Sequence, residues 1–190
     1  MVYKVSKVVL HFSCWLPFGY ILYGIDQRSL GADPQEVVLE IFGLWALIIL
    51  LLCLTLSPIA SILKKPILIR YRRMLGLYFA FYLSLHLITF FVFFAEMDIK
   101  FLLAEVWDRP YISIGILAWI LTLPLVFTST KKMQRYLGRR WKKLHQLTYL
   151  IAILGSIHFL WQSKSDLNEP LIYTIWLILL LGYRLNRKLN

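Results

Sequence analysis

The sequence predicts an all-α integral membrane protein, a six-transmembrane-helix bundle formed by residues 1–190 as a single domain. Of the 190 residues, 59% are hydrophobic and only 16% are charged, whereas a soluble domain carries roughly 25% charged residues. The apolar residues also form long continuous blocks instead of alternating with polar ones, which is typical of helices that lie in a lipid bilayer.

Six apolar blocks are long enough, or nearly so, to cross about 30 Å of hydrocarbon at about 1.5 Å per residue. The first block follows Lys4 and Lys7 and lacks a small-residue cleavage site at its end, which favours a retained helix over a signal peptide. Pro58 is expected to end the second block, and Pro17 and Pro124 are expected to bend the first and fourth. No internal repeat is visible. The predicted spans cover residues 8–25, 37–57, 74–95, 111–129, 145–162 and 170–186.

The cationic residues lie almost entirely on one side of this predicted bundle. With the amino terminus in the cytoplasm, the opposite side keeps only Arg28, Lys100, Arg109 and Lys164 of the 21 Lys and Arg residues, together with all ten acids. The positive-inside rule therefore places both termini in the cytoplasm. We interpret the basic loops as topology signals that attract anionic membrane lipid, with no nucleic acid as partner despite the net charge of +11. A second interpretation is that they dock a soluble cytoplasmic electron donor.

All four histidines fall inside predicted spans, where an ionisable group is costly and is usually functional. The predicted topology places His86 and His158 in the outer half of the bundle, and His11 and His145 in the inner half. Neutral imidazoles that face each other across a helical bundle are the usual axial ligands of b-type haem. The pattern therefore predicts two layers of haem ligands, about 20 Å apart. The alternative for each histidine is a hydrogen bond to a neighbouring helix.

Small residues are expected against a haem macrocycle, and Gly76, Gly115 and Gly155 are available on the third, fourth and fifth spans. The two histidines of the fifth span raise a geometric difficulty. Thirteen residues separate His145 from His158, which places them about 140° apart around a straight helix. The fifth span is therefore expected to be distorted, near Gly155, unless its cofactors lie on different sides.

Cations are expected beside haem propionates or a flavin phosphate, because guanidinium groups bind such oxyanions in bidentate fashion. The candidates at the inner face are Arg72, Arg73, Arg139 and Arg140.

The stretches that hold these residues resemble the MsrQ (YedZ) family, and the resemblance covers nearly all of the chain. The family is the haem-binding membrane subunit of a periplasmic methionine-sulfoxide reductase system of the bacterial inner membrane, and it belongs to the wider ferric-reductase-like transmembrane group. The motifs are LGADP after the first span, ILIRYRRMLGL and SLHL around and within the third, RPYISIGI opening the fourth, LVFTSTKKMQRYLGRRWKKLHQLTYLIAILGSIHFLW from the fourth to the fifth, and PLIY at the sixth.

The resemblance implies an electron-transfer subunit that converts no substrate of its own. Electrons would pass from a cytoplasmic flavin reductase through one or two b haems to a periplasmic molybdenum-cofactor subunit, which reduces methionine sulfoxide in oxidised proteins. FMN is a further cofactor of the family, and direct oxidation of quinol stays an alternative. The motifs SLHL, KLHQLTYL and SIHFLW place ligands at His86, His145 and His158.

The chain departs from the wider group at the inner layer. Two-haem ferric-reductase domains usually carry two histidines on the third span, whereas here that span has His86 alone and arginines at 72 and 73. Arginine is a poor haem ligand because it stays protonated. Three alternatives stay open: an inner haem held by His145 and His11, an inner haem with one unusual ligand, or a flavin in that space.

Two functions of other classes also stay open. Buried histidines relay protons in channels and transporters, and the chain is alternatively a non-redox membrane anchor for a periplasmic enzyme. A haem carrier shows a Soret band that shifts on reduction, whereas a histidine relay is colourless. An anchor should tolerate replacement of His86 or His158 by alanine.

Overall fold

The computed structural model describes residues 2–163 and 166–189, with side chains at 5–163 and 166–186, and every regular element in these ranges is a helix. By length and composition, five helical stretches can cross a membrane. The protein is therefore a multi-pass, all-helical membrane protein, as its composition predicts. The five stretches are Val5–Asp26, Pro34–Ile62, Pro66–Phe93, Pro110–Phe127 and Arg139–Gln162.

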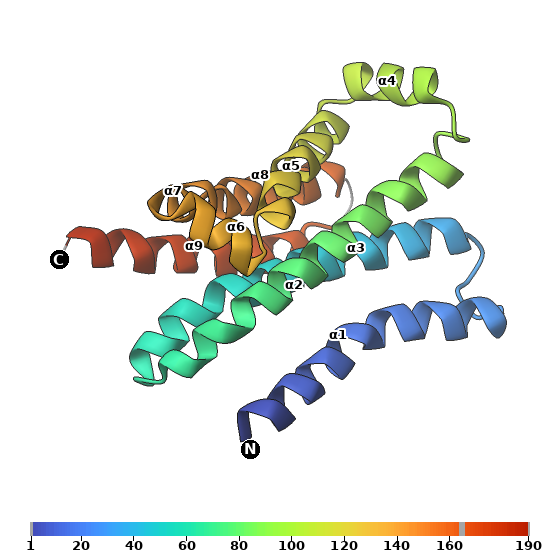
Figure 1. Ribbon diagram of the computed structural model, residues 1–190. Helices are drawn as coiled ribbons and strands as arrows, with labels where there is room; N and C mark the ends of the chain where they lie inside the picture. Colours follow the sequence, from blue (N-terminus) through green and yellow to red (C-terminus); the bar gives the residue numbers. More distant parts are fainter. Residues whose placement is uncertain (1, 164–165, 190) are drawn as a thin grey trace.

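The predicted sixth span falls on the last helix, α9, which is not among these five. Polar and charged residues at both ends of α9 lower its hydropathy, so the count of six spans stays a prediction. The full order is α1 (Val2–Asp26), α2 (Pro34–Ile62), the 3-10 helix η1 (Pro66–Tyr71), α3 (Arg72–Phe93), α4 (Ile99–Asp108), α5 (Pro110–Phe127), α6 (Lys131–Leu137), α7 (Arg139–Leu144), α8 (Leu147–Gln162) and α9 (Asn168–Leu189) (Figure 1).

Helix boundaries follow from local chemistry. Pro34, Pro66 and Pro110 open α2, η1 and α5, because a proline fits the first helical turn, where its missing N–H is not needed. Thr130 caps α6 by accepting a hydrogen bond from the Met133 amide at 3.2 Å. Gly138, with φ of 50°, then separates α6 from α7.

Pro58 does not end the second span, contrary to the prediction. It lies inside α2, which continues to Ile62. A proline within a helix leaves the carbonyl four residues earlier without its usual donor. Here that carbonyl belongs to Leu54, and it accepts a hydrogen bond from Nη2 of Arg184 on α9 at 3.4 Å. A side chain from another helix thus compensates for the proline and lets α2 continue.

The helix breaks at the start of the fifth predicted span, and not near Gly155. α7 ends at Leu144 and α8 begins at Leu147, so His145 and Gln146 lie between the two helices. Two side chains compete there with the helical backbone bonds: His145 Nδ1 bonds the carbonyl of Trp141 at 3.2 Å, and Thr148 Oγ1 donates to the carbonyl of His145 at 2.8 Å. The distortion expected between the two histidines of this span therefore lies at its inner one.

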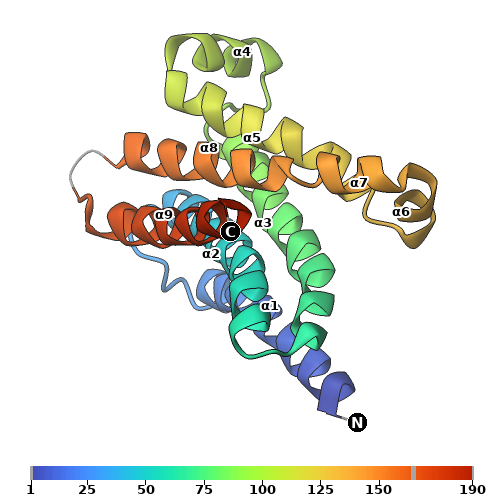
Figure 2. The same cartoon turned by 90° about the vertical axis from the view of Figure 1, so that its left-hand side faces the viewer.

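Two helix pairs form the centre of the bundle. α2 packs most extensively against α3, α5 packs against α8, and α9 lies against α2 and α8 (Figures 1 and 2). α1 is peripheral. Three hydrogen bonds join α1 to tyrosines of η1 and α3: Ser6 with Tyr71, His11 with Tyr78, and Cys14 with Tyr82. Residue numbers increase together in the three pairs, so α1 runs parallel to α3.

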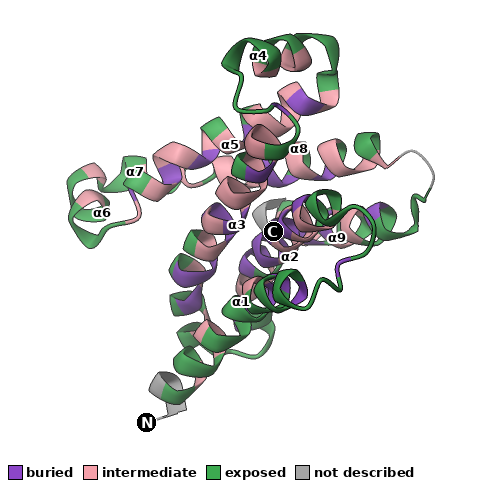
Figure 3. Cartoon of the chain, turned by 90° about the vertical axis from the view of Figure 1, so that its right-hand side faces the viewer, coloured by how far each residue is buried: buried purple, intermediate pink, exposed green. Residues whose placement is uncertain are grey.

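Burial is concentrated on α2 and on the faces of its neighbours that meet it, whereas α4 and α6 are mostly exposed (Figure 3). The outward faces of the long helices are apolar: Phe12, Leu16, Phe127 and Leu179 are all exposed. Extended exposed apolar surface is rare on water-soluble monomers. It is the surface expected of helices that contact lipid.

Candidate functional site

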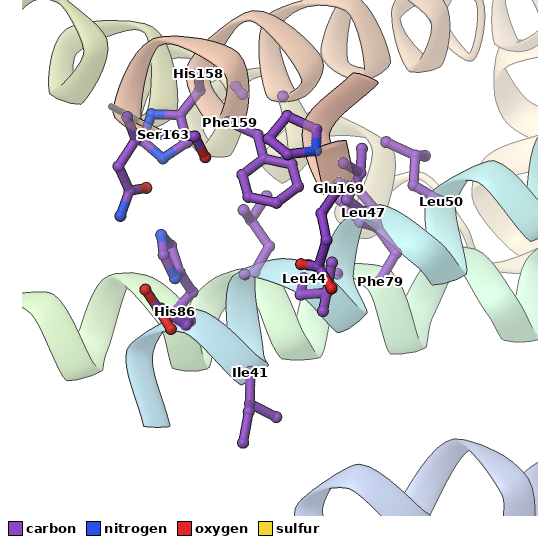
Figure 4. Close-up of a pocket in the computed structure, with 18 of the residues that line it drawn as sticks. Ile41, Leu44, Leu47, Leu50, Phe79, His86, His158, Phe159, Ser163 and Glu169 are labelled. Carbon is purple, nitrogen blue, oxygen red and sulfur yellow. The ribbon is translucent and has the colours of Figure 1, made fainter. Parts of the chain in front are cut away.

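The structure brings His86 of α3 and His158 of α8 together in the centre of the bundle. Their ring centroids lie 6.1 Å apart, and the ring planes meet at 84°. Figure 4 shows both side chains pointing into the same space from opposite sides. These are the two histidines that the predicted span order places in one layer.

Each of the two rings is oriented by a backbone carbonyl of a neighbouring helix. Nδ1 of His86 lies 2.9 Å from the carbonyl oxygen of Leu39 on α2, and Nδ1 of His158 lies 2.7 Å from that of Tyr111 on α5. A carbonyl oxygen only accepts, so Nδ1 carries the proton in both rings. The lone pair is then on Nε2, the arrangement that metal-binding histidines usually show.

A glycine one helical turn beyond each carbonyl makes room for the ring. A Cβ atom at Gly43 would lie 2.9 Å from Cε1 and Nδ1 of His86, and one at Gly115 would lie 3.0 Å from the same atoms of His158. Both distances are shorter than nearly all real Cβ contacts, so any larger residue would push the imidazole away. Gly115 was expected to face a macrocycle and instead contacts the histidine. Gly43 was missed in the sequence.

The two half-sites are equivalent positions of an internal repeat, which the sequence did not reveal. Carbonyl and histidine are separated by 47 residues in both half-sites, and glycine and histidine by 43 in both. The α2–α3 pair therefore corresponds to the α5–α8 pair at an offset of 72 residues. A glycine that twice precedes a histidine by 43 residues was the available signal. The corresponding residues are Leu39 and Tyr111, Gly43 and Gly115, and His86 and His158.

A cavity of about 540 Å³ adjoins both histidines, within the roughly 300–1,000 Å³ of small-molecule and cofactor sites. Its walls are largely apolar, and Gly155 is part of the lining, as expected of a small residue beside a cofactor. Four pairs of lining residues obey the same offset of 72: Ala46 and Ala118, Phe79 and Ile151, Leu83 and Gly155, and His86 and His158.

One end of the cavity is acidic. The amino-terminal ends of α2 and α9 and the loop after α8 meet there, and together they carry four carboxylates into the lining. The part of the lining that the structure describes holds no Lys or Arg. We call this region the acidic end; its carboxylates are Glu36, Glu40, Asp166 and Glu169.

The other predicted histidines lie away from this cavity. The ring of His145 stacks on Trp141 with centroids 3.9 Å apart, and its Nδ1 bonds the Trp141 carbonyl. Nδ1 of His11 bonds the hydroxyl of Tyr78 at 2.9 Å. Both residues are described, and no hydrogen bond or ring contact between them appears in the structure.

The predicted cations also lie outside the cavity lining. Arg73, Arg139 and Arg140 are exposed, whereas Arg72 is half-buried at the start of α3. Gly76 has open space at its Cβ position and is not part of this cavity lining. Sequence reasoning missed a further arginine, Arg184, whose Nε is buried without a hydrogen-bond partner among the described residues.

The arrangement suits a metal-centred macrocycle. Two imidazoles bound to opposite faces of one iron, with Fe–N distances of about 2 Å, have their ring centroids about 6 Å apart, close to the separation of His86 and His158. Within the described ranges, no group of three or more His, Cys, Asp or Glu side chains is placed to hold a bare metal ion. The donor set is therefore a facing histidine pair beside a largely apolar cavity, which fits haem.

Comparison with known proteins agrees with this chemistry. No solved structure matches the chain. Residues 42–156, more than half of the chain, match the family described as ferric reductase like transmembrane component. The match begins one residue before Gly43 and ends two residues before His158, so it covers most of both helix pairs. Members of that family are transmembrane electron-transfer components that typically bind haem. The chain therefore belongs to the ferric reductase like transmembrane component family.

Proposed function

We propose that the protein is a b-type cytochrome that binds haem between His86 and His158 and carries electrons across the bacterial inner membrane. The observation that carries the proposal is the facing pair of Nδ1-anchored imidazoles, 6.1 Å apart between ring centroids. Haem b held there supplies a one-electron carrier in low-dielectric surroundings.

The chain's own residues have defined tasks in this proposal. Leu39 and Tyr111 hold the two rings in one tautomer through their carbonyls. Hydrogen bonds of this kind raise the basicity of a ligating imidazole and fix its orientation. Gly43 and Gly115 let the rings approach the helix backbones. The apolar walls exclude water and so help to set the potential of the site.

A proton relay is less well supported by the same geometry. A relay needs each histidine to receive a proton on one nitrogen and release one from the other. Here each Nδ1 proton points to a backbone carbonyl that belongs to a helix and has no proton to exchange. Both histidines are thus held in one tautomer, which favours metal ligation over proton transfer.

The proposed electron route follows from the MsrQ-like motifs. A cytoplasmic flavin reductase, or the quinol pool, donates electrons, and a periplasmic molybdenum-dependent methionine-sulfoxide reductase accepts them. In this arrangement six spans cross the membrane, both termini are cytoplasmic, and the acidic end faces the periplasm. A partner with a basic patch would be steered to that end, because complementary charge accelerates association.

The inner layer is proposed to serve the donor side of this route. His145 has its Nδ1 bonded to a carbonyl, as in the outer pair, and it is the histidine proposed to serve a second redox group, either haem or FMN. His11 is the candidate ligand opposite His145, although it is bonded to Tyr78 in the structure. The exposed arginines Arg73, Arg139 and Arg140 are then suited to contact with the cytoplasmic donor.

Reconstitution tests the route. The purified protein is placed in quinone-free liposomes with a flavin reductase and NADH on one side and the molybdenum enzyme with methionine sulfoxide on the other. We expect the haem α-band to appear within the reductase turnover time and the sulfoxide to be consumed, and His158→Ala to abolish both. A colourless protein, or sulfoxide reduction that persists in His158→Ala, would show that the membrane subunit is a channel or an anchor and not a cytochrome.

A further inference from the structure

A second polar cluster lies along α2, away from the acidic end, and the haem proposal does not use it. Two consecutive residues of α2 connect it to the neighbouring helices. Sγ of Cys53 donates to the carbonyl of Arg72 at 3.4 Å, and the carbonyl of Leu54 accepts from Nη2 of Arg184 at 3.4 Å. Arginines from α3 and α9 therefore flank the same turn of α2.

Arg184 is half-buried, and one edge of its guanidinium is shielded from water. Its guanidinium carbon lies 4.4 Å from the centroid of the Tyr149 ring on α8, and its Nε is shielded from solvent with no hydrogen-bond partner among the described residues. A long cationic side chain at a membrane boundary normally extends its head group to water. Among the described residues, this guanidinium has one hydrogen bond, to the Leu54 carbonyl freed by Pro58, and its Nε edge has no acceptor.

Among the described residues, no ion pair joins a carboxylate side chain to either of the two arginines. The ten acids all lie between positions 26 and 40, 96 and 108, or 166 and 169. The nearest acid on α2, Glu40, precedes Cys53 by 13 residues, about 20 Å along a helix. Arg72 and Arg184 are close enough to repel each other electrostatically. Two like charges close together without a counter-ion are unfavourable, so the cluster favours an anion beside them.

We propose that Arg184 and Arg72 form a binding site for a phosphate group at this turn of α2. Phosphate carries up to about two negative charges, which matches two arginines, and the guanidinium edge binds its oxygens in bidentate fashion. Arg72 is also close enough to His145 to act on it electrostatically. The phosphate belongs either to FMN or to an anionic phospholipid headgroup. The site does not depend on haem at His86 and His158.

The test compares phosphate-bearing probes with phosphate-free analogues on the purified full chain in neutral detergent. FMN is titrated against riboflavin by flavin fluorescence, and phosphatidylglycerol is compared with diacylglycerol by native mass spectrometry. We expect wild type to prefer one phosphate-bearing probe by about tenfold, equivalent to about 1.4 kcal/mol. Arg184→Gln should reduce that preference to less than about threefold. Arg135→Gln, an exposed arginine of α6, is the control and should keep it.

The outcomes distinguish FMN from a phospholipid as the source of the phosphate, and a phosphate from a haem propionate as the ligand of Arg184. A preference for FMN identifies a flavin site, and one for phosphatidylglycerol identifies a lipid site. Equal binding of probe and analogue by wild type overturns the proposal without any variant having to fold, as does a preference that survives in Arg184→Gln. Haem content is measured in the same samples. If Arg184→Gln loses haem and neither phosphate is preferred, the guanidinium serves a propionate instead. If the protein binds no haem but still prefers a phosphate-bearing probe, the haem proposal fails and the phosphate proposal is supported.

Discussion

The imidazoles of His86 and His158 face each other from α3 and α8 with their centroids 6.1 Å apart and their planes at 84°. The near-perpendicular planes follow from the two anchors, because each Nδ1 is tied to a carbonyl of a different helix. Neither ring can rotate without losing a hydrogen bond at 2.9 or 2.7 Å. The pair is thus oriented before any ligand binds, which reduces the ordering cost of binding.

Removal of either histidine is expected to abolish haem retention at this site. His86→Ala and His158→Ala should each lower the haem-to-protein ratio, measured by pyridine haemochrome, by at least one haem per chain relative to wild type, because one axial bond to the iron is lost. Tyr136→Ala, at an exposed position on α6, is the control and should keep the wild-type ratio. A full haem complement in either histidine variant would refute the assignment.

The two glycines beside the rings are expected to be as sensitive as the ligands. Gly43→Ala and Gly115→Ala add a Cβ at 2.9 and 3.0 Å from an imidazole, and overpacking of this kind costs about 1–3 kcal/mol. Haem should dissociate roughly five- to a hundredfold more readily in a transfer assay to apomyoglobin. Gly76→Ala, a glycine in α3 with no atom within 4 Å of the added Cβ, is the matched control. Equal haem release by all three variants and wild type would contradict the steric argument.

Tyr82 is expected to stabilise the packing of α1 against α3. Its side chain is fully buried, and its hydroxyl donates to the carbonyl of Cys14 at 2.6 Å. Tyr82→Phe should lower the free energy of unfolding by about 1 kcal/mol, a fall in Tm of about 2–4 °C for a chain of this length. Tyr136→Phe, at an exposed position on α6, should leave Tm unchanged. Identical Tm values for both variants in the same detergent would show that this bond contributes nothing.

Pro58 and Arg184 are expected to be coupled. The proline frees the Leu54 carbonyl that Arg184 binds, so Pro58→Ala restores a backbone donor and makes the arginine bond redundant. Arg184→Gln should therefore destabilise the wild type more than the Pro58→Ala background, with a coupling energy of about 0.5–1.5 kcal/mol in a double-mutant cycle. The same cycle with Pro124→Ala, a proline inside α5, should be additive. Additivity in both cycles would disprove the coupling.

Thiol labelling checks the proposed topology. The only two cysteines, Cys14 and Cys53, are both buried, so the unmodified chain should not react with a membrane-impermeant maleimide. Asp98→Cys, before α4, should be labelled in cells whose outer membrane has been permeabilised. Lys132→Cys, on α6, should be labelled only after lysis. The reverse pattern would invert the orientation, and labelling of both sites from one side would contradict the predicted span order.

The sequence predicts that the protein lies in a membrane and that His86 and His158 lie at similar depth. Both predictions need only the length of each apolar block and the position of a residue within its own block. Apolar blocks of bilayer length must be helical, since lipid offers no partners to free backbone groups. Counting residues from each end of such a block then gives the depth of a side chain at about 1.5 Å per residue. The structure brings the two histidines together, with their rings 6.1 Å apart between centroids.

The local interruptions were harder to predict because neighbouring helices decide them. Pro58 ought to stop α2 by its own chemistry, yet the helix passes it where Arg184, 126 residues later in the chain, supplies a donor to Leu54. The break in the fifth span lies at His145, where two side chains bond to backbone carbonyls, and not at the glycine that local propensity favours.

Composition and the spacing of apolar blocks were sufficient to predict an all-helical membrane protein with four histidines in apolar segments. The groups that those histidines contact depend on how the helices pack. Position 43 requires glycine because the His86 ring of another helix lies against it. Arg184 is a candidate binding residue because its buried Nε has no hydrogen-bond partner among the described residues. Such properties arise where residues distant in the chain are packed within about 4 Å of each other, and no pattern along one helix records them.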